Sequence, residues 1–197
     1  MWRKLLFSML LAVLIAPLAA SNQASALTVS PVLLEYEILP GHAVVGTVKV
    51  ENEGDTAESF YPTVQNFAAG DEKGTPSFLG EGDRSSLASW VSYNLSSVYL
   101  APGEQKEVVY TITVPTNAIP GGYYAGLLFT TEKPGDDGIG VAGAVGPLVL
   151  VTVQGQVVES GVVKRFSASQ DSKTSLPVDF NVLFANSGTI HVKPAGV

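Results

Sequence analysis

Residues Leu100–Pro115 read LAPGEQKEVVYTITVP, and this stretch indicates the fold class. Apolar side chains recur at every second position of it, on a face made of Val108, Tyr110, Ile112 and Val114. A period of two residues is typical of a strand that buries one face and exposes the other to water. Pro115 is expected to end the strand, because proline has no N–H to donate to a sheet.

A second stretch, LPGHAVVGTVKVEN at Leu39–Asn52, has the same layout. Both stretches begin with leucine, continue to a Pro-Gly pair and end in a long alternating segment. Proline presets φ at about −65° and glycine accepts a positive φ, so the pair favours a type II turn. We therefore predict tight turns at Gly41 and Gly103, each leading into a long strand.

The rest of the chain before residue 155 shows short β-branched and aromatic runs separated by Gly, Pro and Asn. This punctuation predicts strands, and we find no convincing helical period longer than two turns. The expected strands are Leu27–Tyr36, Ala43–Asn52, Glu58–Phe67, Ser97–Leu100, Gln105–Val114, Gly122–Thr131 and Ala144–Val153. Strands of this number and length predict an all-β, immunoglobulin-like sandwich.

One helical turn is expected in SSLASWVSY, which follows a polar, glycine-rich loop. Ser86 is a suitable residue to cap that turn. Trp90 is expected to fill the core rather than to form a ligand platform.

The end of the chain, VDFNVLFANSGTIHVKPAGV, repeats an earlier pattern. VLFANSGTI has the layout of VKVENEGDT, with an alternating strand followed by Asn and then by Gly at a turn. We expect strands at Val162–Ser169, Pro177–Ala185 and Ile190–Lys193. Residues 161–197 are too few to build two sheets. They therefore predict a second, incomplete sandwich in a fragment of a longer chain, or strands that complete something else.

The beginning of the chain is typical of an export signal. Arg3 and Lys4 precede an apolar run, and the small residues Ala24-Ser25-Ala26 follow it. We expect a signal peptide at 1–26, a sandwich at 27–155, a linker at 156–160 and the second unit at 161–197. An uncleaved anchor is the alternative for residues 1–26.

The composition excludes several classes of function. The formal net charge is −7, and such a surface repels nucleic acid. The chain has no cysteine, so it has neither thiolate catalysis nor disulfides. Contact with a membrane is expected only through the signal peptide or through an anchor outside this chain.

The layout of LTVSPVLLEYEILPG, LAPGEQKEVVYTITVP and above all VPTNAIPGGYYAGLLF resembles the Ig-like domains of WxL-interacting surface proteins. It is more remotely similar to the first domain of pilus chaperones. GPLVLVTVQG followed by SLPVDFNVLFANSGTIHVKPAG resembles uncharacterised exported proteins with tandem sandwiches and a membrane anchor. These resemblances imply an exported sandwich of the prokaryotic envelope.

Two departures limit what the resemblance implies. Pilus chaperones hold a subunit's terminal carboxylate with basic residues, one of them on the first strand, whereas this chain has no Lys or Arg between Ala26 and Lys49. The Trp-x-Leu signature is absent as well, because Val91 and Ser92 follow Trp90.

Few residues qualify as sites. His42 and His191 are far apart and lack paired acids nearby, so we expect surface or structural roles rather than metal binding. Tyr123 and Tyr124 follow two glycines; one should point into the core, and the outward one could stack on a sugar or a partner. Asp136 and Asp137 could offer oxygen atoms to a partner or to Ca²⁺, although their spacing does not match a calcium loop.

We predict no catalytic residue, no cofactor and no metal, since no histidine lies near the serines around Trp90 and no phosphate loop is present. The predicted function is that of a non-catalytic structural or adhesive envelope module. Its loops at Ala69–Ser86 and Glu132–Gly140 would contact an envelope protein or polysaccharide. The alternatives are a periplasmic chaperone-like protein that donates a strand edge, and an accessory glycan-binding domain.

Overall fold

The computed structural model describes residues 26–72, 74–79, 86–133, 143–168 and 178–195. Twelve strands and one helical turn lie in these ranges. They are β1 (Leu27–Ser30), β2 (Leu33–Ile38), β3 (Ala43–Asn52), β4 (Glu58–Ala69), β5 (Pro76–Phe78), α2 (Leu87–Trp90), β6 (Val91–Tyr93), β7 (Val98–Leu100), β8 (Gln105–Thr113), β9 (Gly121–Thr130), β10 (Leu148–Val153), β11 (Gly161–Ala168) and β12 (Phe180–Asn186).

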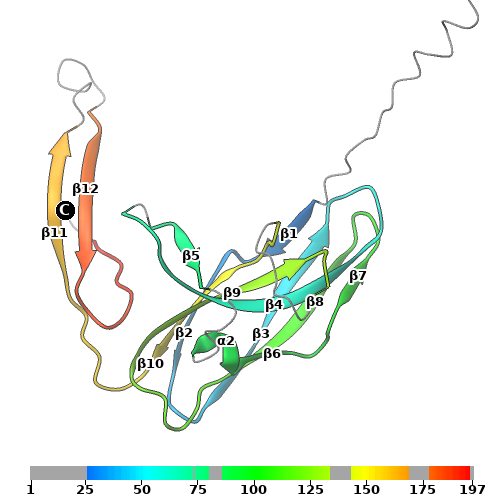
Figure 1. Cartoon of the computed structure of the whole chain (residues 1–197), viewed down its shortest axis with the longest axis horizontal. Helices are drawn as coiled ribbons and strands as arrows, with labels where there is room; N and C mark the ends of the chain where they lie inside the picture. Colours follow the sequence, from blue (N-terminus) through cyan, green and yellow to red (C-terminus); the bar gives the residue numbers. More distant parts are fainter. Residues whose placement is uncertain (1–25, 73, 80–85, 134–142, 169–177, 196–197) are drawn as a thin grey trace, which may run out of the picture.

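Two sheets face each other across one core, and a separate hairpin stands beside them (Figure 1). The first sheet has the order β1-β3-β8-β6. The second has the order β2-β10-β9-β4-β5, and β7 pairs with β4. This arrangement is an immunoglobulin-like β-sandwich, so the predicted fold class is confirmed.

The prediction of one continuous strand at Leu27–Tyr36 was wrong. The segment is divided between the sheets: β1 pairs antiparallel with β3, and β2 pairs parallel with β10. The division falls at Pro31, which has no N–H to continue the ladder with β3. The second ladder begins at once, because the Leu148 amide donates to the Val32 carbonyl at 3.0 Å.

Both Pro-Gly turns form as predicted. Gly41 and Gly103 have φ of +79° and +70°, the region that glycine adopts without steric cost. The His42 amide donates to the Leu39 carbonyl at 3.1 Å, and the Glu104 amide donates to the Ala101 carbonyl at 3.0 Å. These bonds close the two turns at the starts of β3 and β8.

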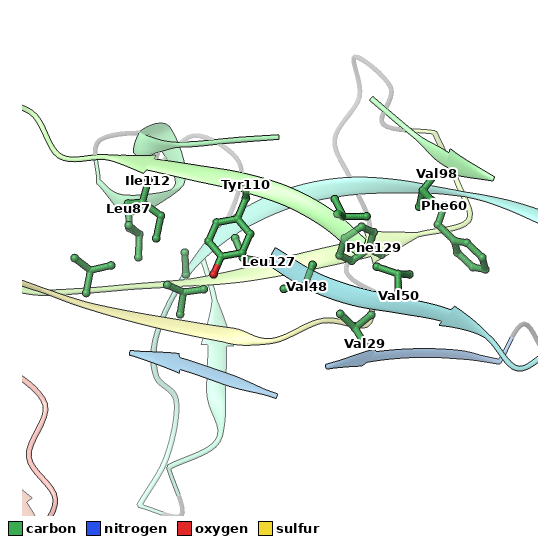
Figure 2. Packing of buried hydrophobic residues seen from close by; sticks show 14 of the residues in the cluster. Val29, Val48, Val50, Phe60, Leu87, Val98, Tyr110, Ile112, Leu127 and Phe129 are labelled. Carbon is green, nitrogen blue, oxygen red and sulfur yellow. The ribbon is translucent and has the colours of Figure 1, made fainter. Parts of the chain in front are cut away.

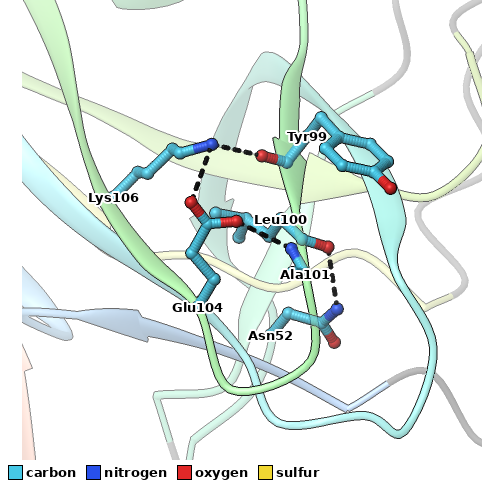
Figure 3. Close-up of polar contacts among 6 residues, drawn as sticks. All are labelled: Asn52, Tyr99, Leu100, Ala101, Glu104 and Lys106. Atoms are coloured by element: carbon cyan, nitrogen blue, oxygen red, sulfur yellow. Dashed lines mark hydrogen bonds and ion pairs between the residues drawn. The ribbon is translucent and has the colours of Figure 1, made fainter.

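Side chains reinforce the second turn (Figure 3). The Glu104 carboxylate accepts from the Ala101 amide at 2.8 Å and forms an ion pair with Lys106 at 3.0 Å. The pKa of Glu104 is held below its usual range. The hydrogen bond from the Ala101 amide is the largest cause, and the hydrogen bond from Lys106 is the second. Lys106 also donates to the Tyr99 carbonyl at 2.7 Å, which ties β8 to β7.

The core lies between the sheets, where alternate side chains of both meet (Figure 2). Its largest fully buried side chains include Tyr110, Phe60, Phe129, Leu87, Leu100, Ile112 and Leu127. The Tyr110 hydroxyl lies 2.6 Å from that of Tyr36, so the one polar end of this large side chain is hydrogen-bonded within the sandwich. Trp90 packs against the core as expected.

The helical turn α2 is confirmed, but its predicted cap is wrong. The side chain of Ser86 makes no capping hydrogen bond. Asn66 of β4 takes this role, since its Oδ1 accepts from the Ala88 amide at 2.9 Å. Asn66, which precedes Ala88 by twenty-two positions, therefore satisfies a free amide of the turn. Its hydrogen bond joins α2 to the second sheet.

Four further elements differ from the prediction. β10 begins at Leu148 rather than Ala144, and Val145 contributes only an isolated bridge to Phe129. The short strands β5 and β6 were not predicted, because three residues carry too little alternation to be recognised. Residues 190–193 form no strand; they lie against the sandwich, as described below.

The hairpin β11–β12 forms a two-stranded sheet of its own. Its apolar side chains are open to solvent: Phe166 is 65% exposed, Phe180 58% and Val182 57%. The rings of Phe166 and Phe180 stack at a centroid distance of 5.3 Å. An isolated hairpin is marginally stable at best in water. Its stability therefore depends on contacts with other parts of the molecule.

The signal peptide was predicted at residues 1–26. All of it except Ala26 lies outside the described residues. Within the described ranges, no helix has the length and apolar character needed to cross a membrane.

Candidate functional site at the junction of the sandwich and the hairpin

A segment that we call the strap, Ser187–Lys193, follows β12 and lies on the sandwich. It is held first by its own unit. The Ser187 and Gly188 amides donate to the Ser160 carbonyl at 2.9 and 3.1 Å, and Val158 and Thr189 exchange two hydrogen bonds. These bonds fix the strap against residues 158–160, which connect the sandwich to the hairpin.

The strap then contacts β9. The Gly122 amide donates to the Thr189 carbonyl at 2.8 Å, and the backbone of His191 hydrogen-bonds to the Tyr124 hydroxyl. Close approach requires the glycine, because a Cβ at position 122 would lie 3.2 Å from the Ile190 Cα and 2.2 Å from the Tyr124 hydroxyl oxygen. The strap therefore rests directly on the backbone of the sheet.

Charged groups complete the contact at β2. Lys193 forms a hydrogen-bonded ion pair with Glu35, and the His191 Nε2 lies 3.7 Å from the same carboxylate. The hydrogen bond from Lys193 is the main reason that the pKa of Glu35 is lowered, and the charge of Lys193 adds to it. Burial acts in the opposite direction and is the second-largest influence on this pKa, but it does not cancel the hydrogen bond from Lys193.

We expect acid to loosen the strap. Because the folded-state pKa of Glu35 is depressed, the stabilisation is fully present above the unfolded-state pKa and is lost as pH falls through the lower folded-state pKa. The Gly122 amide reports this contact, because its acceptor is Thr189. Its hydrogen exchange, corrected for intrinsic rate, should accelerate about two- to fivefold on acidification, a range typical of an exposed ion pair.

Two variants make the acid experiment specific. Glu35→Gln should show the faster Gly122 exchange already at pH 7. Glu37→Gln is the matched control: it lies on the same strand and the same face, and no ion pair involves it in the described part of the chain. Equal exchange in wild type and Glu35→Gln would contradict the assigned contact.

Four rings form a string on the outward face of the second sheet. Phe67 lies 6.0 Å from Phe78 and 5.9 Å from Tyr124 between ring centroids, and Tyr124 lies 6.0 Å from His191. The string connects β5, β4 and β9 to the strap. Aromatic pairs at these distances add to stability beyond their burial, so the strap is held by rings as well as by charge.

An open groove of about 380 Å³ runs beside the strap. Its lining is mostly polar and includes Glu35, Glu37, Glu159, Thr152, His191 and Lys193. In the part of the chain that the structure describes, no three His, Cys, Asp or Glu side chains converge as metal ligands. The groove can therefore offer hydrogen bonds and charge to a polar ligand.

A second contact joins the hairpin to the tip of the β4–β5 arm. Arg165 of β11 lies 3.7 Å from Glu72, and both side chains are largely exposed. A pair of this kind contributes little free energy. The strap is accordingly the main connection between the hairpin and the sandwich.

The predicted site residues fall in different places. Tyr123 packs against the core, its ring 4.5 Å from Trp90, and its hydroxyl donates to the Ile119 carbonyl at 2.8 Å. Tyr124 lies on the outward face under the strap, where burial raises the pKa of its hydroxyl. Asp136 and Asp137 lie outside the described residues, as do part of the predicted loop Ala69–Ser86 and most of the predicted loop Glu132–Gly140.

The two histidines also separate. His42 is exposed in its turn, where its ring nitrogen lies 3.2 Å from the Pro40 carbonyl oxygen. His191 was expected on a strand, but it lies in the strap and contacts Glu35 and Tyr124. This contact could not be predicted from the sequence, because Glu35 and His191 are distant in the chain and neither belongs to a motif.

No family model and no curated protein matches the chain. Among solved structures, it is similar to a PapD-like domain of human CEP192, with 13% identity and a TM-score of 0.42 over 71% of this chain and 92% of that one. It is also similar to the class 5 fimbriae chaperone CfaA, with 13% identity and a TM-score of 0.42 over 83% and 68%.

A third similar structure is the CsuC–CsuE chaperone–tip adhesion subunit complex of Acinetobacter baumannii. The identity is 9% and the TM-score 0.42, over 88% of this chain and 90% of that one. These scores are too low to bear on function, and the assignment of the fold rests on the strand order itself.

Proposed function

We propose that the chain is an exported, non-catalytic structural or adhesive module of a prokaryotic cell envelope. In this proposal residues 1–26 direct export, residues 27–155 form one sandwich, and residues 161–197 begin a second one after the linker 156–160. The strap would hold the two units in a defined orientation. Tyr124 and the neighbouring groove are the surface that we propose for an envelope protein or polysaccharide.

The observation that carries the proposal is a repeated turn. The Asn52 side chain donates to the Thr56 carbonyl at 2.8 Å and accepts from the Gly54 amide at 3.0 Å. Asn186 makes the same two bonds, to the Ile190 carbonyl at 2.7 Å and from the Gly188 amide at 2.9 Å. Repetition of such a specific arrangement favours a protein built from successive sandwiches, an organisation typical of structural and adhesive proteins rather than enzymes.

The junction supports the same proposal. Independent sandwiches joined by a free linker would need no contacts between them, whereas here backbone, aromatic and charged groups all meet at the strap. A fixed angle between neighbouring units is useful in an extended stalk.

Cell fractionation of the native host tests the proposal. We expect the protein in the envelope fraction, with an N-terminus at Leu27 by mass spectrometry. A version that lacks residues 2–26 is the control and should stay in the cytosol. Recovery of the uncleaved natural protein in the cytosol would overturn the proposal.

A second candidate is a chaperone-like protein that exchanges strands with another chain. It is favoured by one observation: β12 has a free edge within the described residues, and the hairpin exposes apolar side chains. Against it, neither β1 nor β2 holds a lysine or arginine that could anchor a partner's terminal carboxylate.

A further inference from the structure

We infer that the free edge of β12 is the pairing site for one kind of strand. This strand runs antiparallel to β12, begins at a turn like the one at Gly103, and belongs to the same polypeptide. It would take the place that β8 has beside β3. The inference rests on the proposed function, because it names the first missing part of the second sandwich.

The two units match residue by residue. Leu27 is opposite Asn52 in the pair β1–β3, and Gly161 is opposite Asn186 in the pair β11–β12. The offset is 134 positions in both strands, from 161 − 27 and from 186 − 52. The next two pairs keep the same offset, so β11 corresponds to β1 and β12 to β3.

The hydrogen bonds around the turn keep the same offset. The Glu53 amide donates to the Ala26 carbonyl at 2.7 Å, and the Ser187 amide donates to the Ser160 carbonyl at 2.9 Å. The bonds of Asn52 and Asn186 described above also correspond. The strap therefore begins as the second copy of the turn that follows β3.

The two asparagines differ in their burial and in one hydrogen bond. This difference indicates which strand would pair with β12. Asn52 is 1% exposed, and its amide nitrogen donates to a further carbonyl, that of Leu100, at 3.2 Å (Figure 3). The turn after Leu100 also pairs with the Asn52 backbone, through the Glu104 carbonyl and the Gly103 amide. Asn186 is exposed, and within the described residues its side chain makes the two local bonds without a further bond like that of Asn52 to Leu100.

The apolar face of the hairpin shows the same difference. Val29, Val48 and Val50 are at most 6% exposed in the core of the sandwich (Figure 2). Their counterparts are Val163, Val182 and Phe184. Val163 and Val182 are 54% and 57% exposed. The hairpin therefore presents the face that a sandwich buries, without the sheets that would cover it.

One difference between the copies has a local cause. β11 has an irregularity in its register between Val163 and Arg165, at the position where β1 ends at Ser30. Pro31 follows Ser30, whereas Arg165 stands at the equivalent position. Because arginine keeps its N–H, β11 continues to pair with β12 after the irregularity.

A second copy of the chain cannot supply a strand of this kind. The strand of the required kind is β8, and both of its edges are already paired, with β3 and with β6. In the first sandwich, the strand beside β3 comes from the same polypeptide, and the constant offset extends this relation to the second unit. A strand that follows β12 in the same chain is therefore the occupant that the repeat favours.

Hydrogen exchange of the native gene product tests the inference. The protein is produced from the complete native reading frame and is compared with residues 27–197 alone. We expect the amides of β12 to exchange at least about a hundredfold more slowly in the native product, as amides of a paired strand do. β3 serves as the internal standard and should exchange at the same rate in both.

The Asn186→Ala variant identifies the pairing. In the native product it should accelerate β12 exchange about tenfold or more, since the buried carbonyl of the incoming turn would lose its donor. In residues 27–197 alone it should leave β12 exchange nearly unchanged.

Two results would overturn the inference: a native product that ends at Val197, or β12 amides that exchange equally fast in both proteins. Protection that appears only after addition of another envelope protein would also overturn it, and would favour strand exchange between chains. Failure of the proposed function has a different signature, because it appears as cytosolic protein in the fractionation experiment.

Discussion

Asn52→Ala is expected to lower the free energy of unfolding by about 2–4 kcal/mol. The substitution leaves the carbonyl of Leu100 without its buried donor and removes the bonds to Thr56 and Gly54. Each buried polar group left unsatisfied costs about 1–3 kcal/mol. Urea unfolding of residues 27–197, followed by tryptophan fluorescence, measures the change.

Asn186→Ala is the matched control within the same chain. It removes the same two local bonds from an exposed turn, so water can replace them and we expect a loss of less than about 1 kcal/mol. Asn52→Asp tests the amide donor independently of side-chain volume. Aspartate has nearly the same volume as asparagine, but it places an oxygen instead of the N–H donor against the Leu100 carbonyl. A small effect of Asn52→Asp would contradict the role assigned to the amide.

Phe129→Ala is expected to be the more damaging substitution, with a loss of about 3–5 kcal/mol. The ring is fully buried between the sheets, 6.0 Å from the ring of Tyr93. A domain of this size is stable by about 5–15 kcal/mol. The variant should therefore unfold at a much lower urea concentration than wild type.

Phe166→Ala is the control for loss of an aromatic ring. The residue is 65% exposed on the hairpin and stacks only on Phe180 among the described rings, so we expect less than about 0.5 kcal/mol. An effect as large as that of Phe129→Ala would mean that another surface covers the hairpin in solution. A dependence of that effect on protein concentration would identify the surface as a second copy.

Local signals predicted the elements that depend on local chemistry. Alternation over residues 105–113 predicted β8, and the two Pro-Gly pairs predicted turns with glycine at positive φ. The Asn-x-Gly pattern after β3 was recognised again after β12. These features could be predicted because each is determined within a few residues by dihedral preference and by a period of two.

The candidate site could be predicted only in part. The outward position of one of the two adjacent tyrosines followed from alternation, and Tyr124 is that residue. Its contacts with Phe67 and His191 did not follow. Glu35 and Lys193 are 158 positions apart, and a pair so distant leaves no trace in composition or spacing. A lone histidine is then read as a surface residue, although His191 contacts both a carboxylate and a ring.

By itself, the sequence determined that the protein is all-β, where its long strands and tight turns lie, and that the Asn-x-Gly turn occurs twice. Only the tertiary structure decided that β1 and β2 belong to different sheets, that Asn66 caps α2, and that the strap rests on β9. The physical reason is the range of the forces involved. Backbone dihedrals and side-chain alternation act between neighbours in the chain, whereas the strap, the cap and the choice of sheet depend on which distant groups the packed core brings within hydrogen-bonding distance.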